Sequence, residues 1–182
     1  MSPKAPYALL AALFVLVFWM VGAYNRLMGL RNSIAQAWAK VDEALKLRAA
    51  AATPLLAALR GPMAAEAGAL DAVQVALLEG TRAATQMGLK PVVEAHAATW
   101  LAAETSLSAS ATRLFALLEQ QAELAQEAEV ATGARAWREA DARLVFARQV
   151  FNEAAQGYNA AIALFPTRLL VGMFRFGRAG RL

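Results

Sequence analysis

An uninterrupted apolar segment near the N-terminus, Tyr7–Ala23, constrains the fold of this chain more than any other feature. Its sequence, YALLAALFVLVFWMVGA, holds no charged residue and lies between Lys4 and Arg26. With its flanks it reaches the roughly 20 residues that an α-helix needs to cross the hydrocarbon core of a bilayer. Trp19 lies near its end, where an aromatic ring favours the headgroup level. We therefore expect a transmembrane anchor over residues 1–24.

Two other interpretations of this segment exist. A cleaved signal peptide ends in small residues, and Val21-Gly22-Ala23 resembles such a site, but the bulky Trp19-Met20 leaves almost no room before it. A buried helix of a soluble protein is the other interpretation, although such helices are seldom apolar on every side. The sequence favours an uncleaved, single-pass anchor.

Positive charge beside the anchor predicts its orientation. Lys4 and the α-amino group precede it, whereas Arg26, Arg31 and Lys40 follow within about 20 residues. The positive-inside rule therefore predicts a cytoplasmic domain, by a margin of one or two charges.

Apolar residues recur at helical spacing along the rest of the chain, and cysteine is absent. Short connections make successive helices antiparallel. The sequence thus predicts an all-α fold, in which the N-terminal transmembrane helix continues into a long antiparallel four-helix bundle. The predicted helices run from Tyr7 to about Ala50, from Thr53-Pro54 through a kink at Gly61-Pro62 to Gly88, over about residues 92–130, and, after a turn at Ala131–Ala134, to about Leu164.

Two segments resemble signatures of the LemA family. The C-terminal signature is matched, within DARLVFARQVFNEAAQGYNAAIALFP, by Ala147-Arg148, Phe151-Asn152, Tyr158-Asn159 and Phe165-Pro166. The N-terminal signature is matched by Tyr24-Asn25, Leu30-Arg31-Asn32, Trp38, Asp42, Arg48 and Pro54, whereas Ala51-Ala52-Thr53 replaces the usual Asp-Leu-Ile. The chain resembles a divergent member of a family of single-anchor bacterial membrane proteins. The resemblance implies an inner-membrane location and a helical bundle over residues 25–165, but no activity, because the family's molecular function is not established.

Four polar residues of the fourth predicted helix fall within about 40° of one another around its axis. They are Asp141, Arg148, Asn152 and Asn159, and we call them the polar ladder. One hypothesis is a hydrogen-bonded arrangement that fixes helix register. The other is a polar groove that binds a ligand or a peptide. The first is favoured.

Two more polar features of the helices stand out. Glu66 occupies an apolar-stripe position, and at about 1.5 Å per residue it lies at the same depth in the bundle as Arg148. We predict a buried ion pair between them; the alternative is that Gly61-Pro62 turns Glu66 into solvent. Asn25 and Asn32 point away from the stripe of the first helix, and they form either a solvated surface or a second interface.

The C-terminal segment, residues 166–182, is basic and amphipathic but too short and too charged to span a membrane. In an up-down bundle it returns to the bilayer. We predict that it lies in the interface and binds anionic lipid. The residues predicted to face lipid are Arg168, Phe174, Arg175, Phe176, Arg178 and Arg181.

These features favour a membrane-anchored interaction or scaffold protein that forms an oligomer or binds another membrane or envelope protein. We expect no cofactor and no enzymatic activity. The alternative is a metal-binding enzyme with carboxylates in the bundle core, but such bundles need Glu-x-x-His pairs on two helices. The only histidine, His96, follows Glu94 by two residues. Nucleic acid is not an expected partner, because only the C-terminal arginines favour it.

Overall fold

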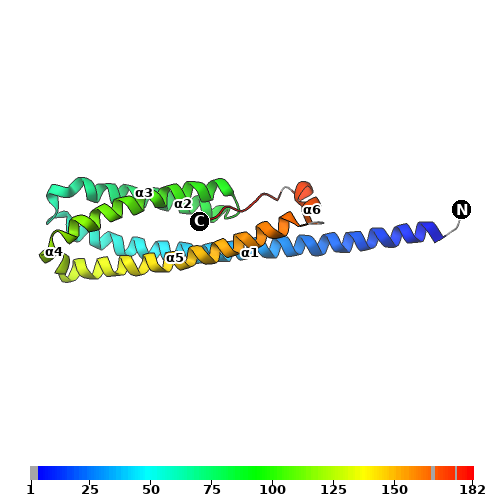
Figure 1. The fold of residues 1–182 in the computed structure, drawn as a ribbon, viewed down its shortest axis with the longest axis horizontal. Helices are drawn as coiled ribbons and strands as arrows, with labels where there is room; N and C mark the ends of the chain where they lie inside the picture. Colours follow the sequence, from blue (N-terminus) through cyan, green and yellow to red (C-terminus); the bar gives the residue numbers. More distant parts are fainter. Residues whose placement is uncertain (1–3, 165–166, 175) are drawn as a thin grey trace.

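The longest element is α1 (Lys4–Arg60), which projects from one end of the molecule as a single helix (Figure 1). The computed structural model describes residues 4–164, 167–174 and 176–182. Among these residues α1 is the one helix that is long and apolar enough to cross a membrane; its most apolar 18-residue window has a mean hydropathy of 1.7 and contains no buried residue. Exposed apolar side chains on every face of a helix suit a lipid environment. The N-terminal part of α1 therefore fits a membrane anchor.

α1 continues through Thr53-Pro54, where the sequence predicts the start of a second helix. Thr53 does not cap a new helix, because its hydroxyl donates a hydrogen bond of 3.0 Å to the carbonyl oxygen of Ala49, as a threonine inside a helix does. The chain reverses at residues 61–63 instead. Gly61-Pro62 is therefore the turn itself and not a kink, so both predictions are wrong at this point. The fully buried Leu55 and Leu59 keep this part of α1 helical by packing it into the core.

Three further long helices and three short ones complete the part of the chain that the structure describes, and no strand is present in that part. The predicted all-α fold is confirmed. The bounds are η1 (Ala64–Glu66, a 3₁₀ helix), α2 (Ala67–Leu89), α3 (Glu94–Glu119), α4 (Ala122–Gln126), α5 (Ala128–Ala163) and α6 (Thr167–Phe174).

The turn predicted at Ala131–Ala134 lies inside α5, so this prediction is wrong. The chain turns earlier, on either side of α4. Gly133 has another role here: a Cβ at this position would lie only 3.0 Å from the Cβ of Leu55. The glycine therefore permits the close approach of α5 to α1.

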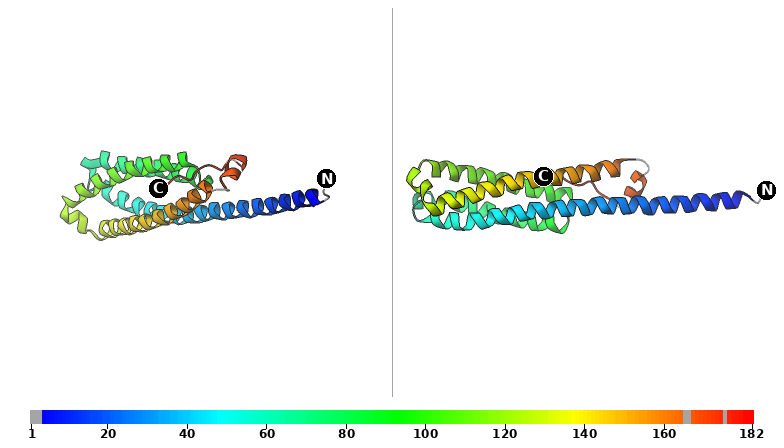
Figure 2. Two further views of the ribbon diagram at one scale, coloured as in Figure 1. Left: turned by 45° about the vertical axis from the view of Figure 1, so that its right-hand side comes forward. Right: turned by 90° about the horizontal axis from the view of Figure 1, so that it is seen from below.

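The long helices form two antiparallel pairs (Figures 1 and 2). α1 packs along α5, and α2 packs along α3; the two pairs join mainly through α1 and α2. α3 and α5 make no extended backbone contact with each other. The bundle is therefore open along one side.

Two apolar clusters make up the core. One contains residues nearer the anchor, such as Ile34, Trp100 and Phe151, and the other contains residues of the far end, such as Leu59 and Trp137. Both clusters draw on α1, α2, α3 and α5, which explains the apolar stripes of the sequence. A layer of buried charge lies between them and is described below.

After α6 the chain turns back along the bundle. Residues 176–182, which we call the tail, run in extended form between the two helix pairs and reach the middle of the molecule (Figure 1). The tail thus leaves the anchor end, contrary to the prediction that the whole C-terminal segment lies in the membrane interface.

Candidate functional site: a groove between α3 and α5

A groove separates α3 from α5 on the open side of the bundle, and aromatic ring pairs link α3 to α1 and to α5. Trp100 of α3 meets Trp38 of α1 edge to face, with ring centroids 5.9 Å apart. Phe115 of α3 meets Trp137 of α5 in the same way, at 5.7 Å. Edge-to-face pairs of this kind fix the separation of the helices. They leave a space between the two backbones that other groups can enter.

The tail fills the part of the groove nearer the anchor. Its buried side chains recur at every third position, Phe176, Ala179 and Leu182, each between 5 and 8 % exposed. A repeat of three is that of a polyproline-II chain, which has three residues per turn and leaves its backbone free to bond to neighbours. All three residues belong to the same apolar cluster as Trp100. The tail therefore completes the core where α3 and α5 stay apart.

Two asparagines of α5 hold the tail by its backbone. The side-chain amide of Asn159 donates to the carbonyl oxygen of Ala179 at 2.9 Å, and its oxygen accepts from the N–H of Ala179 at 2.8 Å. Asn152 makes the same pair of bonds with Leu182, at 2.6 and 2.7 Å. Each side-chain amide thus bonds to both the N–H and the C=O of one tail residue, as a residue of a neighbouring antiparallel strand would. Because the bonds go to backbone atoms, they do not depend on the side chains of the bound segment.

The spacing of the two asparagines matches an extended chain. Seven residues of α-helix rise about 10.5 Å, and three residues of an extended chain cover about 9–10 Å. Asn152 and Asn159 are seven residues apart, and the residues they bind are three apart. The match explains how a regular helix can hold a second chain that runs antiparallel to it.

Gly180 marks the narrowest point of the groove. A Cβ at this position would lie 2.5 Å from the Cβ of Ala97 and 3.0 Å from the Cα of Glu94, both at the start of α3. Real Cβ atoms do not approach that closely, so only glycine fits here. By contrast, a Cβ at Gly177 would meet nothing within 4 Å. The groove therefore selects its occupant at one defined position.

Tyr158 adds a third contact to the tail, since its hydroxyl donates to the carbonyl oxygen of Gly177 at 3.0 Å. Burial raises the pKa of the Tyr158 phenol above its ordinary value of 10.0, and the positive charge of Arg31 opposes that rise. The phenol is thus neutral and able to donate over the physiological range. The guanidinium of Arg31 also stacks on the Phe176 ring, 5.6 Å from its centroid.

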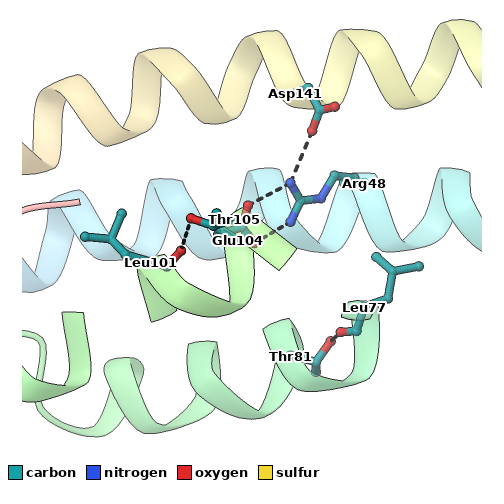
Figure 3. Close-up of polar contacts among 7 residues, drawn as sticks. All are labelled: Arg48, Leu77, Thr81, Leu101, Glu104, Thr105 and Asp141. Carbon is teal, nitrogen blue, oxygen red and sulfur yellow. Dashed lines mark hydrogen bonds and ion pairs between the residues drawn. The ribbon is translucent and has the colours of Figure 1, made fainter. Parts of the chain in front are cut away.

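A layer of buried charge crosses the groove where α1, α3 and α5 meet (Figure 3). Arg48 of α1, 7 % exposed, donates two hydrogen bonds to the carboxylate of Glu104 on α3, at 2.6 and 2.9 Å. It donates a third to Asp141 of α5, at 3.2 Å. Burial by itself lowers the pKa of Arg48, but the bonds and charges of the two carboxylates outweigh burial and raise it. Arg48 therefore links three helices through a bidentate pair and one further bond.

Beyond the tail the groove is open on both sides of this charged layer, from Leu101 and Arg148 to Phe115 and Trp137. The open section has a volume of about 670 Å³, within the range of ligand pockets. Its polar lining comes from both walls, with Thr105 and Ser108 on α3 and Asp141 and Arg148 on α5. Arg148 also lines the smaller cavity, of about 370 Å³, that contains Leu182 at the end of the tail. It therefore lies between the bound tail and the open section.

The predicted ion pair between Glu66 and Arg148 is not formed. Both residues are described, and Arg148 instead stacks on Trp100, with its guanidinium carbon 5.5 Å from the ring centroid. Glu66 is half-buried at the end of η1. The turn at residues 61–63 resets the helical phase, so the stripe that placed Glu66 in the core does not apply to it.

The polar ladder lies along one face of α5, but its members do not bond to one another. Asn152 and Asn159 bind the tail, Asp141 binds Arg48, and Arg148 stacks on Trp100. The hypothesis of a polar groove thus describes this face better than a register-fixing network within the helices.

Other predicted residues lie outside the groove. Asn25 and Asn32 are exposed on α1, and their role as an interface stays a prediction. The lipid-facing position of Phe176 is wrong, because that side chain is 7 % exposed in the core. Its spacing from Ala179 and Leu182 buries it. Arg168, Arg178 and Arg181 are exposed; Arg175 and the side chain of Phe174 lie outside the described part.

Glu104 is the functional-site residue that the sequence prediction missed. It follows Trp100 by four residues and precedes Leu107 by three, so it interrupts the apolar stripe of α3. A charge on an apolar stripe is the signal that could have identified it. Arg48 carries the same signal on α1, where it separates the two clusters.

The model of the LemA family matches residues 37–181, which is most of the chain and includes the groove and nearly all of the tail. No curated protein matches this chain.

Proposed function

The chain belongs to the LemA family, which is membrane-associated and of unclear molecular function, and on that premise we propose that it is a membrane-anchored interaction protein whose binding surface is the groove between α3 and α5. The groove accepts an extended polypeptide segment through its backbone. In the unliganded protein the tail occupies it, and a segment from a partner protein replaces the tail.

The observation that carries this proposal is the double pair of hydrogen bonds from Asn152 and Asn159. Reciprocal bonds to backbone N–H and C=O groups are the means by which many peptide-binding proteins hold extended ligands. Here the bonds are 2.6–2.9 Å long and spaced to match an extended chain. The same groove also contains an open section of about 670 Å³, lined by residues of both α3 and α5.

The proposal is tested in the full chain with one substitution that empties the groove. Gly180→Val places a side chain against Ala97 and expels the tail, but it changes no residue of the groove walls. A fluorescent peptide of sequence FGRAGRL should then bind this variant, and should bind a chain with Asn152→Ala and Asn159→Ala added much more weakly.

Gly177→Val is the matched control, because its Cβ meets nothing and the tail should stay bound. A peptide with valine in place of the second glycine should not bind either protein. Circular dichroism of each variant confirms that the bundle is folded. Failure of FGRAGRL to bind a folded Gly180→Val chain would refute the proposal.

We further propose that α6 touches anionic headgroups through Arg168, and that copies of the chain or a second membrane protein supply the partner. The anchor then lies in the bacterial inner membrane, with the bundle in the cytoplasm. The charge count around the anchor supports the orientation. Protease added to intact spheroplasts should spare the bundle; rapid digestion would place it on the other side.

A metal enzyme in the bundle core remains the alternative from a different class. Among the described residues no three histidine, aspartate or glutamate side chains come together as a metal site requires. Metal analysis of the purified protein decides the matter, and stoichiometric iron or manganese would favour the enzyme.

A further inference from the structure

The open section of the groove lies in line with the tail. Val145 and Arg148 line both the open section and the cavity at Leu182, so the two spaces meet at this turn of α5. A chain that followed the path of the tail past Leu182 would therefore enter the open section without changing direction.

The spacing of α5 fixes what such a chain would meet. Arg148 precedes Asn152 by four residues, or about 6 Å of helix, which an extended chain covers in about two residues. Asp141 precedes Asn152 by 11 residues, or about 16 Å, which corresponds to about five residues of an extended chain. The first charged group beyond the tail is therefore the guanidinium of Arg148, and the second is the carboxylate of Asp141.

The charges of these two groups differ in how far they are already neutralised. Asp141 accepts a hydrogen bond from Arg48 at 3.2 Å. Arg148 forms no ion pair with any carboxylate in the described part of the chain; it lies on the face of Trp100, which fixes its position at the mouth of the open section. A positive group held in place beside an empty polar space fits a negative side chain.

We propose that the natural occupant of the groove is an extended partner segment that carries glycine at the Gly180 position and an acidic residue two or three positions beyond the Leu182 position, where it pairs with Arg148. This inference rests on the proposed function and specifies its ligand. The tail supplies the glycine, but its residues 176–182 contain no aspartate or glutamate that could pair with Arg148. A longer acidic segment would make the contacts of the tail and the additional ion pair, and would displace the tail for that reason.

Three peptides test the acidic position, with the full-length Gly180→Val chain as receptor. FGRAGRLSDS carries aspartate two residues beyond the leucine, FGRAGRLSNS is its neutral match, and FGRAGRLSSSSDS carries the aspartate at the fifth added position, opposite Asp141. The first should bind about threefold to tenfold more tightly than the second, as expected for one part-buried charged pair. The peptide with aspartate at the fifth added position should bind no more tightly than FGRAGRLSNS. High salt should reduce the advantage of FGRAGRLSDS over FGRAGRLSNS.

The receptor variant Arg148→Gln, added to Gly180→Val, assigns the gain to one residue. It should abolish the difference between FGRAGRLSDS and FGRAGRLSNS, a double-mutant cycle that does not require the two receptors to have equal affinity. If FGRAGRL binds but the aspartate gives no gain, or the gain survives Arg148→Gln, the inference is wrong while the proposed function stands. If no peptide binds the folded receptor, both are wrong.

Discussion

Arg48 and Glu104 are both buried, and they form an ion pair between α1 and α3. Removing one partner of a buried ion pair leaves the other charge uncompensated, whereas replacing both with apolar residues can be nearly neutral. Arg48→Met should therefore lower the free energy of unfolding in detergent by about 3–5 kcal/mol, because Glu104 is left buried. The double variant Arg48→Met, Glu104→Leu should recover most of that loss.

Lys46→Met is the matched control for Arg48, because it breaks only an exposed pair with Asp42 and should change stability little. Losses that add in the Arg48 and Glu104 double variant, instead of cancelling, would show that the two side chains are not coupled.

Tyr158 gives the tail a pH dependence. Burial raises the pKa of its phenol above the unfolded value of 10.0, so its stabilising contribution is complete below pH 10 and is lost as the pH rises through the folded pKa. The phenolate cannot donate to Gly177. The free energy of unfolding should thus fall more steeply above pH 10 in the wild type than in Tyr158→Phe. Equal slopes would mean that Tyr158 ionises freely and does not hold the tail.

Pro54 distinguishes the observed course of α1 from the one that the sequence predicts. Inside a helix, proline removes one backbone hydrogen bond, so Pro54→Ala should restore it and raise the free energy of unfolding by about 1–3 kcal/mol. At the first position of a new helix proline is favourable, and the same change would lower stability. Pro62→Ala, in the turn, is the control, and thermal unfolding of the three proteins measures the outcome.

The elements show where sequence patterns succeed and where they fail. The apolar stripes located the helices, because burial imposes the period of 3.6 directly on the sequence. The turns between helices were predicted at the wrong residues, because Thr53-Pro54 and Gly133 are each compatible with two local structures. Threonine and proline can begin a helix or lie within one, and glycine can form a turn or allow close packing, as Gly133 does against Leu55. Only tertiary contacts decide between these meanings.

The tail escaped prediction for a different reason. Its buried residues recur every three positions, a period of neither helix nor strand, and its arginines resemble those of a lipid-binding segment. The asparagines that hold it were identified as a ladder on one face of α5, but their partner lies 20 and 30 residues away. The sequence therefore identified the residues of α5 that hold the tail, but it did not identify the tail as their partner.

The whole molecule is two antiparallel helix pairs joined along one side, with two ties across the open side, made by the tail and by Arg48, besides the Phe115–Trp137 ring contact. Near the anchor the tail links α5 to the start of α3, through Asn159 and Gly180. Farther out, Arg48 links α1 and α5 to Glu104. Because α3 and α5 make no extended backbone contact, each tie should stabilise its own length of α3.

Hydrogen exchange on the full chain can separate the two ties. Gly180→Val should increase exchange of the amides of residues 97–103, near the start of α3, and leave residues 107–114 protected. Arg48→Met should do the reverse, increasing exchange around residues 104–111, because the cost of a buried, unpaired Glu104 is relieved when this part of α3 moves away. In both variants α1 should stay protected where α5 covers it, since their long contact does not involve either tie. An equal increase along all of α3 in both variants would show that α3 opens as one unit, and that the groove cannot admit a longer segment without releasing the whole hairpin.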